Sequence, residues 1–247
     1  PVAPAMLEKL RVKFTGVSSA SMACLGDKPL TKRILREAKL PTPDWAEPPD
    51  FAGVEDGHKY IVKSSTEDAS LGLDDASVVN GHDAAKARAE MCAAKYGGRW
   101  FAERYVEGRE FNVAVLEEEG GPRVLPIAEM RFEDWAKDRP RIVGYAAKWD
   151  DGSKDSTKTV RDFEWRRKEP ALYSALCDGA KAAWNLFGLR GFARVDFRAD
   201  ISGNALILEI NPNPCLEPLA GFAAAAGQAG MDYADLIERI IAAAHRD

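Results

Sequence analysis

The sequence predicts an α+β protein, because segments with apolar residues at helical spacing are interspersed with segments in which apolar and polar residues alternate. The clearest helix begins after Asp27, which can cap it, with Pro29 in its first turn and Pro41 just beyond its end. The clearest strands lie between Gly191 and Asn211, where the alternation continues on both sides of a turn. No internal repeat or low-complexity linker interrupts the chain.

The other elements follow from the same two patterns, taken in chain order. Strands are predicted over residues 59–63, 100–106, 111–116 and 123–130, and helices over 83–96, 171–187 and 233–244. Gly97 and Gly188 end the first two of these helices, and Glu107 with Gly108 predicts a turn between two strands. The long polar segment 131–159 has weak periodicity, and we interpret it as a flap.

The strand pair between residues 191 and 211 places several polar groups on one face. The expected members of this face are Arg194, Asp196 and Arg198 on the first strand and Ile207, Glu209 and Asn211 on the second, with Ala193, Val195, Phe197, Leu206, Leu208 and Ile210 on the other face. A turn centred between residues 202 and 203 would place Asp196 across from Glu209. The same register would place Arg194 across from Asn211.

Two carboxylates held side by side repel each other, so their burial requires a shared proton or a cation. The oxygen ligands of Asp196, Glu209 and Asn211 favour Mg²⁺ (or Mn²⁺), which nucleotide phosphates commonly complete. Arg194 would then contact a phosphate oxygen. The alternative is a solvated hairpin face with a cross-strand ion pair, and the pattern alone does not decide between the two.

The residues from Gly191 to Phe197 and from Leu208 to Pro214 resemble the magnesium hairpin of the ATP-grasp ligases, specifically of the D-alanine–D-alanine ligases. That family carries G-x-x-R-x-D and then E-x-N-x-x-P-G, and the resemblance extends over nearly the whole chain. It implies an ATP-grasp fold, in which two α+β lobes hold ATP between antiparallel sheets. It also implies a ligase that joins a small-molecule carboxylate to an amine through an acyl phosphate, because a carboxylate is a poor electrophile until its oxygen becomes a phosphate leaving group.

The resemblance implies a role for individual residues as well. The expected contacts to ATP are Lys28 and Lys63 with the phosphates, Glu103 with the adenine amino group, the backbone of Arg104, Tyr105 and Val106 with the base, and Glu110 with the ribose. Lys148 matches the lysine of the family's mobile flap. Arg194 would stabilise charge on the transferred group or on the tetrahedral intermediate.

The loop after the strand at residues 59–63 departs from the family. The family typically has E-G-S-S-x-G where this chain has EDASLG at 67–72, and the carboxylate of Asp68 would repel a phosphate. The loop could use Ser70 and Gly72 to bind phosphate through backbone amides, or it could be an ordinary polar connection.

A second departure concerns the acceptor substrate. Ala220 stands about where the family has a serine that holds the acceptor's carboxylate, and an alanine cannot donate a hydrogen bond. Cys215 replaces a glycine, and we interpret it as a small buried residue rather than a nucleophile. Ala220 and Cys215 favour one alternative, a ligase with a non-alanine acceptor. A second alternative, a nucleotide-binding module without catalysis of its own, is favoured by the absence of the N-terminal domain that the resemblance implies. We expect the isolated chain to make little D-alanyl-D-alanine while still binding Mg²⁺-ATP.

The resemblance also divides the chain. Residues 1–26 are expected to be the remnant of a preceding N-terminal domain and a linker, 27–105 the small lobe, and 106–247 the large lobe with the magnesium hairpin. The ligases have an N-terminal domain that helps to bind the first substrate. The chain would then be a truncation or a natural short form, and a homodimer or a partner could supply the missing portion.

Composition agrees with this interpretation. With 247 residues, 46% hydrophobic and 30% charged, the chain is typical of soluble globular proteins. A net charge of −5 argues against a general nucleic-acid binder. The four cysteines are scattered and do not predict disulfides, so a reducing cytoplasm is the expected location. No segment has the length of a membrane span or the pattern of a signal peptide.

Overall fold

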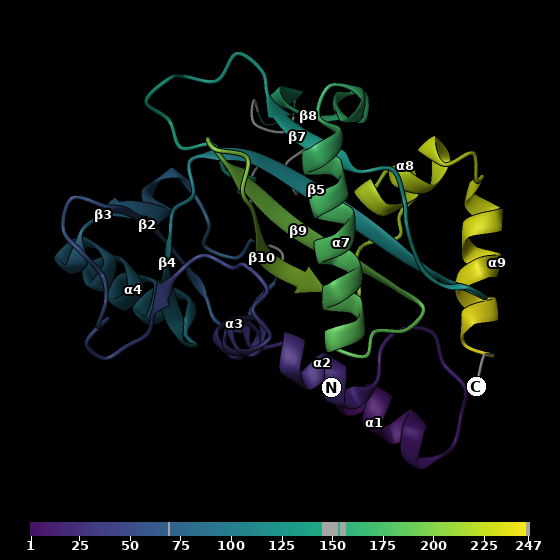
Figure 1. Ribbon diagram of the computed structural model, residues 1–247. Helices are drawn as coiled ribbons and strands as arrows, with labels where there is room; N and C mark the ends of the chain where they lie inside the picture. The colour runs from purple at the N-terminus through teal and green to yellow at the C-terminus, as the bar shows by residue number, and fades with distance from the viewer. Residues whose placement is uncertain (69, 145–152, 154–156, 246–247) are drawn as a thin grey trace.

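The computed structural model describes residues 1–68, 70–144, 153 and 157–245 (Figure 1). Its elements are α1 (Val2–Lys9), α2 (Ser19–Leu25), α3 (Lys28–Glu37), β1 (Trp45–Ala46), β2 (Lys59–Ser64), β3 (Val78–Asn80), α4 (His82–Tyr96), β4 (Trp100–Arg104), β5 (Gly108–Glu118), β6 (Gly121–Val124), β7 (Ala128–Phe132), β8 (Thr159–Asp162), α7 (Pro170–Leu186), β9 (Phe192–Asp200), β10 (Ala205–Asn211), α8 (Gly221–Gln228) and α9 (Tyr233–Ala243). No helix in the described part of the chain is long and apolar enough to cross a membrane.

The strands form two antiparallel sheets, which confirms the predicted α+β class. The small sheet has the strand order β1-β4-β2-β3, and the large sheet has the order β10-β9-β5-β7-β8 with β6 paired to β5. Figure 1 shows α7 lying across the large sheet and α4 beside the small one. The strand expected over 123–130 is instead two strands, β6 and β7, which pair with different parts of β5.

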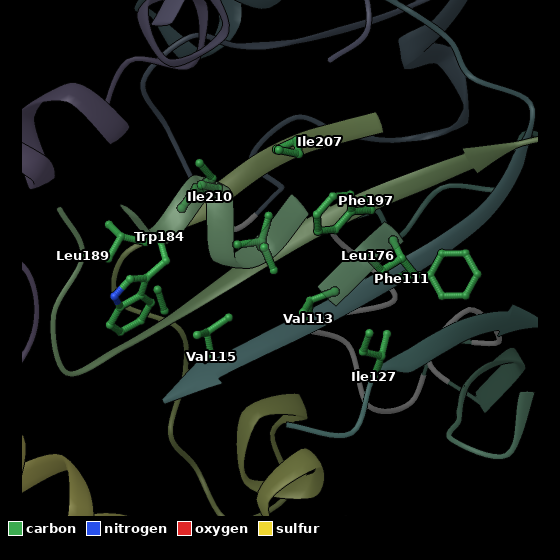
Figure 2. Close-up of a cluster of buried hydrophobic side chains, with 14 of the residues drawn as sticks. Phe111, Val113, Val115, Ile127, Leu176, Trp184, Leu189, Phe197, Ile207 and Ile210 are labelled. Carbon is green, nitrogen blue, oxygen red and sulfur yellow. The ribbon is translucent and has the colours of Figure 1, made fainter. Parts of the chain in front are cut away.

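Apolar side chains cover both faces of the central strand β5. Val113 and Val115 point toward α7 and pack in a cluster with Leu176 and Trp184 of that helix (Figure 2). The alternate residues Ala114 and Leu116 belong to a second cluster on the opposite face, formed with α8 and α9. Because successive side chains of a strand point to opposite faces, one strand contributes to both cores.

The small sheet has a separate core against α4. Ala85, Ala89 and Cys92 of this helix pack on Val62 and Trp100 of the sheet. The small side chains of α4 allow its backbone to approach the strands closely.

Helix α3 packs differently from the rest of the small lobe. Its Leu35 is fully buried in the cluster beneath the large sheet, although the sequence-based division places residues 27–105 in the small lobe. The boundary at Asp27 stays a prediction, and this packing favours a bridging position for α3 between the two sheets.

The β9–β10 hairpin has the predicted pairs but a different path. Asp196 pairs with Glu209, and Arg194 pairs with Asn211. Nearer the turn the register is shifted by one residue, and a bulge between Ile207 and Glu209 restores the predicted pairing. The bulge returns Ile207 to the core with 1% exposure. The expectation that Ile207 shares the polar face was therefore wrong.

Candidate functional site

One face of the large sheet changes from apolar to polar along its central strands. Leu116 of β5 pairs with Phe192 of β9, and both are buried beneath α8 and α9. Four residues further along the same face, Asn112 pairs with Asp196. The apolar half of the face packs on helices, and the polar half forms the candidate site.

Asp196 is 5% exposed and is bound on both oxygens. Arg194 donates from Nε to Oδ1 at 2.7 Å and from Nη2 to Oδ2 at 2.8 Å, and Asn112 Nδ2 donates to Oδ1 at 2.8 Å. Asn112 was not predicted as a site residue. Its place beside Asp196 depends on the pairing of β5 with β9. Because the two residues are 84 positions apart in the sequence, the local sequence pattern does not show that they are neighbours.

The charges around Arg194 show how acidic this site is. Burial of its guanidinium lowers the pKa of Arg194, but the carboxylates of Asp196, Glu209 and Glu110 outweigh burial, so the pKa is raised. Three carboxylates therefore act on one largely buried cation. A second cation near Asp196 and Glu209 would reduce their mutual repulsion, so these residues fit a divalent metal.

A pocket lies at the open end of the hairpin. It is lined by Leu25, Lys28, Thr31 and Asp68 on one side and by Leu208, Glu209, Ile210 and Asn211 on the other. Lys28 of α3 and two of the three predicted metal ligands therefore line the same pocket. Among the described residues there is no cluster of three or more His, Cys, Asp or Glu that could hold a metal. The predicted set has two carboxylates and an amide, so it falls outside such a cluster.

Lys28 is held by the loop that follows β2. Its Nζ donates to the Glu67 carbonyl at 2.9 Å and to Asp68 Oδ1 at 3.0 Å. A phosphate that binds Lys28 must therefore compete with Asp68. The change from glycine to aspartate in this loop gives the lysine an internal partner.

The rest of this loop is held by packing. Ser70 has a φ of 60° and donates from Oγ to the Val143 carbonyl at 3.1 Å. A Cβ at Gly72 would lie 2.7 Å from Trp100 and 2.9 Å from Tyr96, so only glycine fits there. Packing alone accounts for this glycine. The phosphate role of Ser70 stays a prediction.

Glu103 lies fully buried between two lysines. Lys63 Nζ donates to Glu103 Oε1 at 2.7 Å, and Lys32 forms an ion pair with Oε2. Burial alone would raise the pKa of Glu103, but the charges of Lys32 and then Lys63 lower it below its usual value. Lys32 was missed by sequence reasoning, because a lysine four residues after Lys28 looks like an ordinary helix-surface residue.

The end of β4 and the two residues after it are hydrogen-bonded to both sides of the site. The backbone N–H groups of Arg104 and Tyr105 donate to the carbonyls of Asp44 and Lys59 at 2.7 and 2.9 Å. The Val106 carbonyl accepts from Arg198 Nη1 at 2.7 Å. These backbone groups already form hydrogen bonds within the protein, so other groups of the segment would have to bind an adenine.

Two further predicted residues remain. Glu110 Oε2 accepts from Arg198 Nη2 at 3.2 Å, so the residue implied for the ribose lies on the polar face of β5. Lys148 lies outside the described residues.

The loop before α8 lies close to this polar face. Arg161 Nη1 donates to the Leu219 carbonyl at 3.2 Å, and partial burial together with the charge of Arg194 lowers the pKa of Arg161. Ala220 is the N-cap of α8 with an extended backbone and no side-chain cap. Cys215 is exposed, not buried as expected from its residue type.

Comparison with known proteins shows similarity to one family of ligases. A family described as the D-ala D-ala ligase C-terminus matches residues 49–242. The D-alanine–D-alanine ligase of Desulforudis audaxviator is 34% identical over 96% of this chain and 74% of that protein. The uncharacterized protein y4sG of Sinorhizobium fredii is 32% identical over 98% of this chain and 69% of that protein. The crystal structure of D-alanine–D-alanine ligase from Bacillus anthracis complexed with ATP matches with a TM-score of 0.76 and 21% identity, over 99% of this chain and 74% of that one.

Proposed function

We propose a reaction for this chain from one premise, that it belongs to the D-ala D-ala ligase C-terminal family. The ATP-grasp fold expected from the sequence is confirmed by the solved structures that it matches. On this premise the chain is an ATP-dependent ligase that forms a C–N bond. The comparisons do not favour the two alternatives, a non-alanine acceptor or a module without catalysis, because the relatives from Desulforudis audaxviator and Saccharophagus degradans are named D-alanine–D-alanine ligases.

The proposed reaction has two steps. An oxygen of the first substrate's carboxylate attacks the γ-phosphorus of ATP, ADP leaves, and an acyl phosphate forms. The amine of the second substrate then attacks the acyl carbon, phosphate leaves, and the amine loses a proton as the amide forms. Both steps develop negative charge on oxygen, so fixed positive groups around the phosphates should accelerate them.

The residues of the polar face have separate roles in this proposal. Asp196, Glu209 and Asn211 hold Mg²⁺, which supplies neutralisation of the phosphate charge when bound. Lys28 and Lys63 bind phosphate oxygens, and Arg194 stabilises the charge that develops in transfer. One observation carries the proposal: Lys28, Glu209 and Asn211 line a single pocket.

The small sheet contributes the base-binding side of the proposal. Glu103 accepts a hydrogen bond from the adenine amino group, Arg104 to Val106 line the base, and Glu110 binds the ribose. ATP would then lie between the two lobes, residues 27–105 and 106–247, with α3 bridging them.

The direct test is to titrate the protein with ATP and Mg²⁺ by calorimetry, and separately to supply D-alanine and ATP. The proposal predicts saturable nucleotide binding that requires Mg²⁺, together with release of phosphate and formation of an amide product, detected by mass spectrometry. Because Ala220 replaces the family's serine, we expect only a small amount of D-alanyl-D-alanine among the products. ATP binding with no amide product from any amino acid would reject the ligase reaction.

Replacing Lys63 by Met should weaken ATP binding roughly tenfold, because it removes a charged contact to phosphate while keeping the apolar stem. The remaining affinity should also depend less on salt. Calorimetry at two salt concentrations measures both effects. Lys59 is a matched control, since it lies on the same strand β2 and its side chain is 57% exposed. Equal affinity in Lys63→Met and Lys59→Met would show that Lys63 does not bind phosphate.

Replacing Ala220 by Ser should have two effects. A serine at this extended N-cap can accept a hydrogen bond from the first turn of α8, which should stabilise the protein by about 1 kcal/mol. Its hydroxyl could also donate to the acceptor's carboxylate, so the KM for the D-alanine acceptor should fall. Thermal melting and steady-state kinetics measure the two effects.

Ala220→Asp is the control for this prediction. Aspartate caps a helix as well as serine does, but its charge repels a carboxylate. We therefore expect Ala220→Asp to raise the melting temperature without lowering the acceptor KM. If both variants change the KM equally, Ala220 does not lie at the acceptor site.

A further inference from the structure

Lys32 is a fully buried lysine whose partners come from different parts of the fold. Its side chain is 1% exposed. Its Nζ forms an ion pair with Glu103 of β4 and donates to Thr42 Oγ1 at 2.7 Å. Burying a lysine is costly unless its charge is paired, so this position needs both partners.

Thr42 continues the connection into the large sheet. Its Oγ1 donates to the Ile207 carbonyl at 2.8 Å, and the Ile207 N–H donates to the Pro41 carbonyl at 2.8 Å. Residues 41 and 42 therefore pair with the edge strand β10. The contact is at Ile207, where the hairpin bulge begins, two residues before Glu209.

The two ends of this connection belong to the two halves of the site. At one end is Glu103, on the face of the small sheet that is not covered by α4, since its neighbours Trp100 and Ala102 occupy the covered face. At the other end is the hairpin that carries Asp196 and Glu209. Direct hydrogen bonds and one ion pair join these ends through a single lysine.

We propose that Lys32 is a positioning residue that fixes the carboxylate of Glu103 in the small sheet relative to the metal-bearing hairpin of the large sheet. This inference rests on the proposed function, in which Glu103 reads the adenine amino group. Under this inference Lys63 and Lys32 have different roles. Lys63 is 14% exposed and can turn to a phosphate, whereas Lys32 stays in place and keeps Glu103 ionised and oriented.

The surroundings of Lys32 are consistent with a charged amine. Burial lowers the pKa of Lys32 to about 8, with Glu103 acting in the opposite direction, Lys63 lowering the pKa further and Glu209 raising it. The centroid of the Trp45 ring on β1 lies 6.0 Å from Lys32 Nζ. At neutral pH the amine is therefore mainly protonated and can hold the carboxylate.

Substitution of Lys32 by Met tests this role through base selectivity. Inosine triphosphate has an oxygen in place of the adenine amino group, so a correctly oriented Glu103 should favour ATP over it. In Lys32→Met we expect the ATP preference to fall roughly tenfold, as for the loss of one charged hydrogen bond, while the KM for D-alanine is unchanged. Arg33→Met is the matched control, because Arg33 is the next residue of α3 and its side chain is 56% exposed.

Thr42→Val keeps the proposal testable if Lys32→Met does not fold. It preserves the shape of the side chain but removes the hydroxyl, so the preference for ATP over inosine triphosphate should fall several-fold. In the double variant the loss of ATP preference, expressed as a free energy, should be smaller than the sum of the losses in the two single variants, because both substitutions break the same connection.

Three results would count against the proposed role of Glu103 or against the positioning role of Lys32, and each result has a different meaning. A wild-type protein without ATP preference would overturn the role of Glu103, and this inference with it. A normal preference in Lys32→Met, with wild-type selectivity confirmed, would overturn the inference alone. If the losses of ATP preference in Lys32→Met and Thr42→Val add fully in the double variant, Lys32 is not connected to the hairpin through Thr42.

Discussion

Replacing Glu209 by Gln should lower Mg²⁺-dependent ATP turnover by roughly two orders of magnitude or more and leave the fold intact, as for the loss of about 3 kcal/mol of transition-state electrostatics. Glutamine has nearly the same shape as glutamate, so the hairpin pairing with Asp196 should persist. It carries no charge, so the metal and the phosphates bound to it are less well neutralised. Phosphate release at saturating ATP, together with a thermal melt, measures the two properties.

Glu238→Gln is a suitable control for this change, because Glu238 is an exposed residue of α9, away from the polar face. It should have wild-type turnover at every Mg²⁺ concentration. Unchanged turnover in Glu209→Gln, with a normal melting curve, would reject the assignment of the hairpin as a metal site.

The part of the site that the sequence could predict is the part that depends on local pattern. The alternation in residues 192–200 and the polar turn after it predicted the two strands and the pairing of Asp196 with Glu209, and the pairing holds because the bulge offsets a one-residue shift nearer the turn. Asp27 caps α3 by accepting from the Leu30 N–H at 3.0 Å, as its residue type predicts. These features need only neighbours in sequence, where the preferences of single residues act.

The part that could not be predicted depends on contacts between distant segments. The bulge at Leu208 has no local signal, and it was needed to bury Ile207 while keeping Glu209 on the polar face. Asn112 and Lys32 acquire their roles only when β5 pairs with β9 and when α3 packs between the sheets. Even a correct pattern of strands does not specify which strand lies next to which.

In the proposed site, Arg194 and the metal would share Asp196. In the structure both oxygens of Asp196 are bound by the Arg194 guanidinium, and Asn112 binds one of them as well. A metal that binds Asp196 must therefore compete with Arg194 or reorient it. The arginine then becomes available to a phosphate oxygen, as the proposed mechanism requires.

Replacing Arg194 by Met should therefore destabilise the protein by about 3 kcal/mol, since it leaves a buried carboxylate with a single amide donor. For a chain of this size the melting temperature should fall by roughly 6–12 °C. Turnover should also fall, because the cation that stabilises the transferred group is lost.

Mg²⁺ without nucleotide should restore part of the lost stability in Arg194→Met, because the metal replaces the missing positive charge and no longer competes with the arginine. The wild-type protein should gain less from the same Mg²⁺ concentration. The control is Arg194→Met combined with Asp196→Asn, which removes the metal ligand and should abolish the recovery. If Mg²⁺ stabilises the single and the double variant equally, the metal does not bind at Asp196, and the ion pair of Arg194 with Asp196 is structural only.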